Sequence, residues 1–370
     1  MKNKIKIGLF LIALVGLGLY INNSYSYKEK GIDDSSSYIV NVKESYNKYF
    51  WKYKNEITKI IFDKKYNQDK YEEKWDISTK KDNSIVAYLV EENSRKVVYI
   101  IGEEIQANSD SSYLFANFTN LEEIKNLNYL DTSEVVSMAH MFDSCSMLKK
   151  VDLSNLNTSK VTDMSSLFAS DINLLEINMD NLDTSNVLSF EKMFFECSSI
   201  ENLDLEHLNT TKLKNMSSMF KYASNLKEIK INNIETKNVT DMSFMFANCE
   251  SLLSLDLSNF NTAKVTDMRG MFANCLELES LDLSSFDFKN VKMAGYAKET
   301  IIPTYMEYGM FYNSPKINTI MTINNSNMDS LYMFDASQNV ILNYTKAGET
   351  LVDKIVSSKI NVKKGMLVNE

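Results

Sequence analysis

Acidic side chains are the residues of this 370-residue chain whose type and spacing could bind a ligand. Seven charged residues recur at matching places of a repeated pattern: Asp152, Asp180, Asp204, Glu206, Lys230, Asp256 and Asp282. Carboxylates on a regular surface attract basic or polar proteins, and such association slows as salt is added. The alternative is a solvated acidic face that only keeps the protein soluble, and the sequence leaves both interpretations open.

Histidine and cysteine, which many enzyme sites need, are scarce. His140 and His207 are too few for a multi-histidine metal centre or a Ser-His-Asp triad. No glycine-rich phosphate-loop motif occurs. We therefore expect no catalytic residue, no cofactor, no metal and no enzymatic activity. The one enzymatic alternative is carboxylate-based glycan hydrolysis, with its acids in residues 49–112 or in an insertion at 294–309.

The cysteines follow a pattern of their own, because each lies three residues after a repeated phenylalanine. They are Cys145, Cys197, Cys249 and Cys275. Together with Asp171 and Ala223 they predict one buried column of small side chains. Only Cys249 and Cys275 come from adjacent repeats, so only that pair could approach disulfide distance.

A 26-residue repeat must position these columns. Its Met-Phe dipeptide, or a close variant, places phenylalanines at Phe142, Phe168, Phe194, Phe220, Phe246 and Phe272. Each repeat holds L-x-x-L-x-L-x-x-F, which predicts a short strand, and V-x-x-M-x-x-M-F, whose spacing predicts a 3₁₀-like or short helical return. One repeat cannot close a core alone, so stacking must bury its apolar columns. We expect a right-handed leucine-rich-repeat-like solenoid with parallel strands on one side, 3₁₀ or helical returns on the other, and a cap at both ends.

A threonine column accompanies the phenylalanines and predicts side-chain hydrogen bonds to the backbone of the neighbouring repeat. Its members are Thr158, Thr184, Thr210, Thr236 and Thr262.

Two segments, Leu255–Thr262 (LDLSNFNT) and Lys264–Phe272 (KVTDMRGMF), resemble the signature of the BspA-like leucine-rich-repeat surface proteins. The resemblance covers residues 113–293 strongly and 294–345 weakly. It implies a bacterial, non-enzymatic surface solenoid that serves in adhesion or protein interaction.

The first 26 residues have the form of a signal peptide, with three lysines before an apolar run at 7–21. At about 1.5 Å per residue this run spans ~23 Å, less than a ~30 Å hydrocarbon core. A cleaved signal and a retained N-terminal membrane anchor therefore both remain open. The rest of the chain is expected outside, at the cell surface on the extracellular side of the membrane, or secreted.

The remaining organisation follows from composition and from breaks in the repeat. The expected parts are a polar spacer at 27–48, an N-terminal cap at 49–112, regular repeats at 113–293, an insertion at 294–309, irregular repeats at 310–345 and a C-terminal cap at 346–370. Residues 49–112 could instead form a small separate binding module. The C-terminal cap is expected to contain a short amphipathic helix at 349–358 and a strand at 359–364.

The net charge of −9 argues against nucleic-acid binding. We expect an exported, surface-associated protein that binds a cell-surface or extracellular-matrix protein through its exposed strand face. The alternative is a structural envelope protein without a specific ligand. Contact with the membrane is expected only through the N-terminal segment, if that segment is retained.

Overall fold

The computed structural model describes residues 36–295, 309–330, 333–334, 339–358 and 362–369. The chain divides into Met1–Ser36 and Ser37–Glu370, and every element below belongs to the second unit. The apolar run at 7–21 and most of the insertion at 294–309 lie outside the described residues. No helix within the described ranges is long and apolar enough to cross a membrane.

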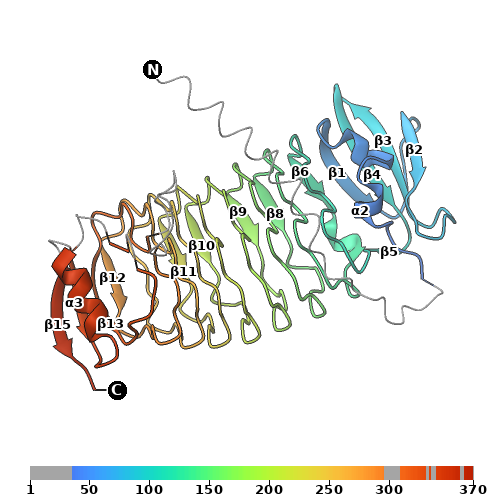
Figure 1. The fold of residues 1–370 in the computed structure, drawn as a ribbon. Coiled ribbons are helices and arrows are strands. Elements are labelled where there is room, and N and C mark those ends of the chain that lie inside the picture. The colour runs from blue at the N-terminus through green and yellow to red at the C-terminus, as the bar shows by residue number, and fades with distance from the viewer. Residues whose placement is uncertain (1–35, 296–308, 331–332, 335–338, 359–361, 370) are drawn as a thin grey trace. The chain divides into compact units, whose positions relative to one another are not determined.

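A mixed five-stranded sheet opens the described chain (Figure 1). After the helix α2 (Val42–Ser45) and the 3₁₀ helix η2 (Tyr49–Tyr53), its strands are β1 (Ile57–Asp63), β2 (Glu73–Asp76), β3 (Val86–Glu92), β4 (Arg95–Ile101) and β6 (Glu123–Lys125), in the order β2-β3-β4-β1-β6. β3 pairs antiparallel with β2 and β4, whereas β1 pairs parallel with β4 and β6. Asn93 and Ser94 connect β3 to β4 with φ of 52° and 60°, as a tight hairpin turn needs.

Short parallel pairs follow through the repeats. β5 (Ile105–Gln106) pairs with β7 (Leu130–Asp131), on either side of the 3₁₀ helix η3 (Leu127–Tyr129). β8 (Lys150–Asp152) pairs with β9 (Glu176–Asn178), and β10 (Asn202–Asp204) pairs with β11 (Glu228–Lys230), each pair 26 residues apart in sequence. A second ladder of single parallel bridges passes from each repeat to the next. It joins Asp110, Ser137, Asp163, Ser189, Asn215, Asp241, Asp267, Met293 and Asp329 in that order.

The C-terminal end is a four-stranded parallel sheet, which Figure 1 shows in orange to red. Its strands are β12 (Ser280–Leu283), β13 (Asn318–Ile323), β14 (Asn339–Tyr344) and β15 (Val362–Leu367). The helix α3 (Glu349–Ser358) buries Leu351, Val352 and Ile355. These side chains recur at positions i, i+1 and i+4, so they lie on one side of the helix.

Apolar columns form the core. Consecutive phenylalanine rings from Phe115 to Phe334 stack with centroids 5.2–5.9 Å apart, and all are buried. The predicted threonine bonds are confirmed in all five repeats. Oγ1 of Thr158, Thr184, Thr236 and Thr262 donates to a backbone carbonyl of the next repeat at 2.9–3.1 Å, and Oγ1 of Thr210 accepts the Glu235 N–H at 2.7 Å. The columns therefore bind each repeat to its neighbour through both ring packing and hydrogen bonds.

The expected fold class, a leucine-rich-repeat-like solenoid, is wrong. The described strands form several small, separate sheets instead of one continuous parallel sheet, and the N-terminal sheet is mixed. Between η3 and α3, no described residue lies in a 3₁₀ or α-helix, so the predicted helical returns are not present there. The V-x-x-M-x-x-M-F segments form turns and bridge in parallel with the next repeat.

Left-handed residues explain why these segments are not helical. Each V-x-x-M-x-x-M segment contains one residue of positive φ, for example Ser166 (53°), Lys192 (56°) and Ser218 (56°). The turn that contains it closes by an i to i−3 hydrogen bond, as from the Met193 N–H to the Phe190 carbonyl at 3.1 Å, which spans Lys192. A left-handed residue cannot continue a right-handed helix, so the three-residue apolar spacing arises from successive turns.

Candidate functional site

The seven charged residues lie on or directly after the short strands. Asp152, Asp204 and Lys230 end β8, β10 and β11, whereas Asp282 lies within β12. The other three follow β9, β10 and the bridge at Ser254: Asp180, Glu206 and Asp256. Glu206 is partly buried and the other six are exposed. We call the surface formed by these seven residues the strand face.

Alternation along each strand places these side chains outside. In β8, for instance, Asp152 lies between buried Val151 and buried Leu153. Successive side chains of a strand point to opposite faces, so the buried neighbours direct the carboxylate to solvent. The structure therefore gathers the predicted residues on one surface of the repeats.

Four of the carboxylates also close a turn, a role that the sequence interpretation missed. Oδ1 of Asp152, Asp204, Asp256 and Asp282 accepts the backbone N–H of the residue two positions later, at 2.9–3.1 Å. These backbone N–H groups are the main reason that the pKa of Asp204, Asp256 and Asp282 lies below the ordinary value. The carboxylates of Asp204, Asp256 and Asp282 are thus ionised at neutral pH, and the turns fix all four side chains in direction. Their D-x-S or D-x-E spacing is the signal for this turn.

Opposite charges pair across the joined strands. Lys150 lies 2.6 Å from Glu176 across β8 and β9. Lys230 lies 3.2 Å from Asp204 across β10 and β11, and the bond to that carboxylate is the main cause of its raised pKa. Lys230 is therefore already paired with an acid of the same surface, which leaves carboxylates to dominate the strand face.

A groove opens between β9 and β10, where the two-stranded sheets do not join. Its cavity measures about 800 Å³. Its lining residues are Leu175, Glu176, Ile177, Asn178, Met179, Asp180, Ile200, Asn202, Leu203, Asp204, Glu206 and His207. Four of the twelve are carboxylates and none is lysine or arginine. The groove thus combines an acidic rim with aliphatic side chains.

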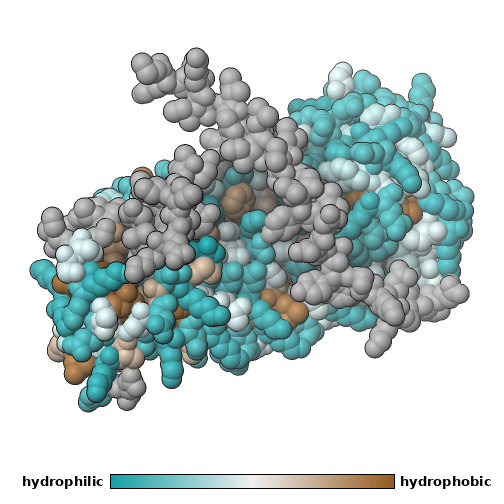
Figure 2. Space-filling view, in the orientation of Figure 1, coloured by the Kyte–Doolittle hydropathy of each residue, from teal (hydrophilic) through white to brown (hydrophobic). Residues whose placement is uncertain are grey.

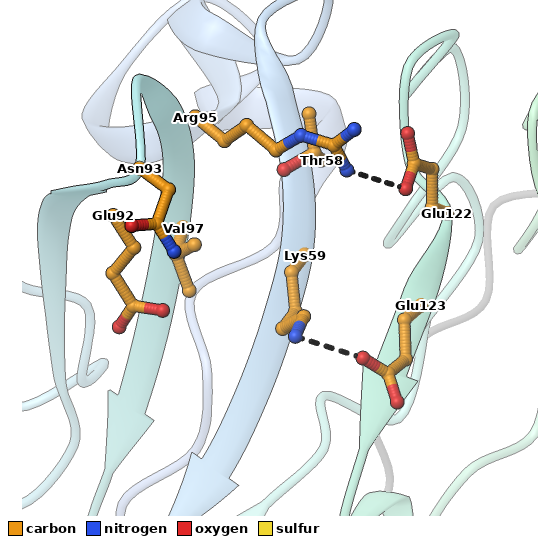
Figure 3. A pocket seen from close by; sticks show the side chains of 8 residues that line it. All are labelled: Thr58, Lys59, Glu92, Asn93, Arg95, Val97, Glu122 and Glu123. Atoms are coloured by element: carbon orange, nitrogen blue, oxygen red, sulfur yellow. Dashed lines mark hydrogen bonds and ion pairs between the residues drawn. The ribbon is translucent and has the colours of Figure 1, made fainter.

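A second, smaller pocket lies on the N-terminal sheet and measures about 300 Å³. Figure 3 shows its two basic side chains directed at carboxylates of a neighbouring segment. Arg95 lies 2.7 Å from Glu122, and Lys59 lies 2.9 Å from Glu123. Because both cations are already paired, this pocket offers a ligand less unbalanced charge than the groove does.

Histidine and cysteine do not form a site. The four cysteines are free and buried, and burial raises the pKa of each thiol, so none is a ready nucleophile. His140 stacks on Tyr113 at 4.6 Å and contacts Asp143 at 2.7 Å, whereas His207 lines the groove. Within the described part of the chain, no three His, Cys, Asp or Glu side chains gather to hold a metal.

Asp171 differs from the other members of the cysteine column because it is a carboxylic acid, yet it is as fully buried as the cysteines are. Its Oδ1 accepts the backbone N–H of Cys145 at 2.7 Å, whereas its Oδ2 has no hydrogen-bond partner. Burial is the main cause of its pKa lying well above the ordinary value. The sequence placed Asp171 in the correct column but gave no sign of this perturbation.

Comparison with known proteins gives one kind of match. The family model described as "Mycoplasma protein of unknown function, DUF285" matches residues 109–229, 196–301 and 224–346. These overlapping matches span 109–346, which is more than half of the chain. No curated protein matches the chain. No solved structure matches it either.

Proposed function

This chain belongs to the family described as Mycoplasma protein of unknown function, DUF285, and we propose that it is an exported surface protein that binds a basic or polar protein partner through the strand face. The observation that carries the proposal is the recurrence of exposed carboxylates at one place of the repeat, in Asp152, Asp204, Asp256 and Asp282. Fixed carboxylates lose little conformational freedom on binding, and their summed field accelerates encounter with a basic partner.

The proposed location outside the cell rests on the sequence. Three lysines precede the apolar run at 7–21, as in an export signal or an N-terminal anchor. The resemblance to BspA-like surface proteins supports adhesion to a cell-surface or matrix protein. Protease treatment of intact cells tests the location: digestion of residues 37–370 supports export, whereas protection of the whole chain contradicts it.

A matched pair of variants tests the strand face. The face variant Asp152→Asn, Asp204→Asn, Asp256→Asn and Asp282→Asn removes four charges but keeps the Oδ1 atoms that close the turns. The control Asp69→Asn, Glu103→Gln, Glu104→Gln and Glu250→Gln removes four exposed charges elsewhere. We expect the face variant alone to lose binding to cells or matrix proteins. Equal binding by both variants would contradict the proposal.

A structural envelope protein without a specific ligand is the second candidate. The observation that favours it is the turn-closing role of the four aspartates, since this role explains their recurrence without a partner. Under this alternative, the face variant would behave as the unchanged protein does on every surface tested.

A further inference from the structure

We propose that the groove between β9 and β10 binds an extended, basic segment of the partner protein by adding it to the exposed strand edges. This inference rests on the proposed function, because it assigns the partner's contact to one part of the strand face. The chemistry of the groove, not a resemblance, identifies the ligand.

The edges of β9 and β10 that face each other carry unpaired backbone groups. β9 bonds to β8 through Glu176, whose N–H donates to the Lys149 carbonyl at 3.2 Å, and through Asn178, whose carbonyl accepts the Leu153 N–H at 2.8 Å. Successive residues of a parallel strand alternate the edge to which their N–H and C=O point. The backbone groups of Ile177 therefore point towards β10.

The same rule applies to β10. The Glu201 carbonyl accepts the Lys227 N–H at 2.8 Å, and the Leu205 N–H donates to the Lys230 carbonyl at 2.9 Å, so odd-numbered residues face β11. The backbone groups of Asn202 and Asp204 consequently point towards β9. Within the described residues, no backbone hydrogen bond joins β9 to β10.

Acidic residues lie on both sides of this opening. The joined pairs β8–β9 and β10–β11 carry opposite charges 26 residues apart, as in Lys150–Glu176 and Asp204–Lys230. Across the β9–β10 opening, the equivalent positions hold Glu176 with Asn202 and Asn178 with Asp204, so no opposite charges face each other there. Asp180 and Glu206, which follow the two strands, are both acidic and both line the groove. Like charges on neighbouring strands repel, and a ligand cation between them would relieve that repulsion.

Aliphatic side chains supply the second half of the recognition. Ile177 and Leu203 are only partly buried, and Leu175 is 49% exposed. In Figure 2, brown hydrophobic atoms lie in the region that β9 occupies in Figure 1. Side chains of an extended segment alternate between its two sides, so basic residues can meet the acidic rim while aliphatic residues cover Ile177 and Leu203.

The probe is a fluorescent peptide of alternating lysine and valine, titrated into the full chain by anisotropy. We expect saturable binding that is lost when lysine is replaced by glutamate and when the peptide backbone is N-methylated, since N-methylation removes its hydrogen-bond donors. Unchanged binding of the N-methylated peptide would overturn strand addition, and unchanged binding of the glutamate peptide would overturn the charge argument. No saturable binding of the lysine peptide would overturn the whole inference.

Matched variants locate the site. The groove variant Asp180→Asn with Glu206→Gln removes two charges from the strand face, and the control Asp69→Asn with Glu250→Gln removes two exposed charges outside it. We expect about tenfold weaker peptide binding for the groove variant and little change for the control. Hydrogen exchange should slow on peptide binding at the amides of Ile177, Asn202 and Asp204. Equal weakening in both variants, or no slowing at these amides, would contradict the proposal.

The groove inference and the proposed function can fail independently of each other. If the peptide does not bind in the groove while the face variant with four Asp→Asn changes still loses cell binding, only the groove inference fails. If the face variant keeps its cell binding, the proposed function fails whatever the peptide does.

Discussion

Replacing the buried acid Asp171 with asparagine should make the protein's stability depend less on pH. Asp171 is fully buried, and its Oδ2 has no hydrogen-bond partner. Asparagine keeps nearly the same shape and retains the Oδ1 that accepts the Cys145 N–H at 2.7 Å. The change thus removes the ionisable group while it preserves the bond between neighbouring repeats.

The sign follows from the raised pKa of Asp171 in the folded protein. A group whose folded pKa exceeds its unfolded pKa contributes stability that is present below the unfolded pKa and lost as pH rises towards the folded pKa. Asparagine has no such loss. Relative to the unchanged protein, Asp171→Asn should therefore gain about 1.4 kcal/mol of unfolding free energy per pH unit across that window.

The measurement is urea unfolding, followed by circular dichroism, at a series of pH values from about 4 upwards. At the lowest pH the variant should be the less stable protein by about 1–3 kcal/mol, because the new amide N–H groups are buried without acceptors. The difference should shrink and then reverse as pH rises. If the difference in unfolding free energy between the two proteins stays constant over the whole pH series, Asp171 is not a buried carboxyl with a raised pKa.

Asp183→Asn is the control for this series. Asp183 is exposed, and its Oδ1 accepts the Ser185 N–H at 3.0 Å. The hydroxyl and N–H of Ser185 lower the pKa of Asp183, so the stability that it contributes is lost as pH falls, in the opposite sense. The control variant should therefore show no gain with rising pH.

Three further predictions concern the columns and turns. Phe220→Ala should lower the unfolding free energy by about 3–5 kcal/mol in urea titrations, since it leaves a cavity between the rings of Phe194 and Phe246. A loss below about 1 kcal/mol would contradict the stacked core. All four thiols should resist iodoacetamide in the native protein and react after unfolding in urea, because they are buried and their pKa is raised. Rapid labelling of the native protein would contradict this burial. Asp256→Ala should lower the unfolding free energy by about 0.5–1.5 kcal/mol, and Asp256→Asn should lower it less, because of the two only asparagine can accept the Ser258 N–H. Equal losses of stability in thermal unfolding would exclude the turn-closing role.

The sequence predicts the columns of this protein better than it predicts their local conformation. Pairing of residues 26 apart and burial of the phenylalanine and cysteine columns follow from periodicity, because an unstacked apolar column would remain in water. The helical returns were predicted wrongly because apolar spacing does not reveal which residue is left-handed. Lys192 and Phe244 adopt positive φ although their residue types rarely do.

The candidate site was predicted in part. Alternation along the strands suffices to place Asp152 and its equivalents on the exposed side. The opening between β9 and β10 does not follow from the repeat, because the same 26-residue spacing separates strands that pair and strands that do not. The acidic rim that Asp180 and Glu206 give to this opening becomes interpretable only when the pairing of the strands is known.

Recognition through the strand face is tested most directly by the salt dependence of association between the protein and its surface partner. The rate constant for association with intact cells should fall steeply as ionic strength rises, for both the unchanged protein and the four-charge control variant. For the variant with Asn at positions 152, 204, 256 and 282, the rate should be lower at low salt and should depend less on ionic strength. A variant that retains both the rate and the salt dependence of the unchanged protein would contradict recognition through the strand face.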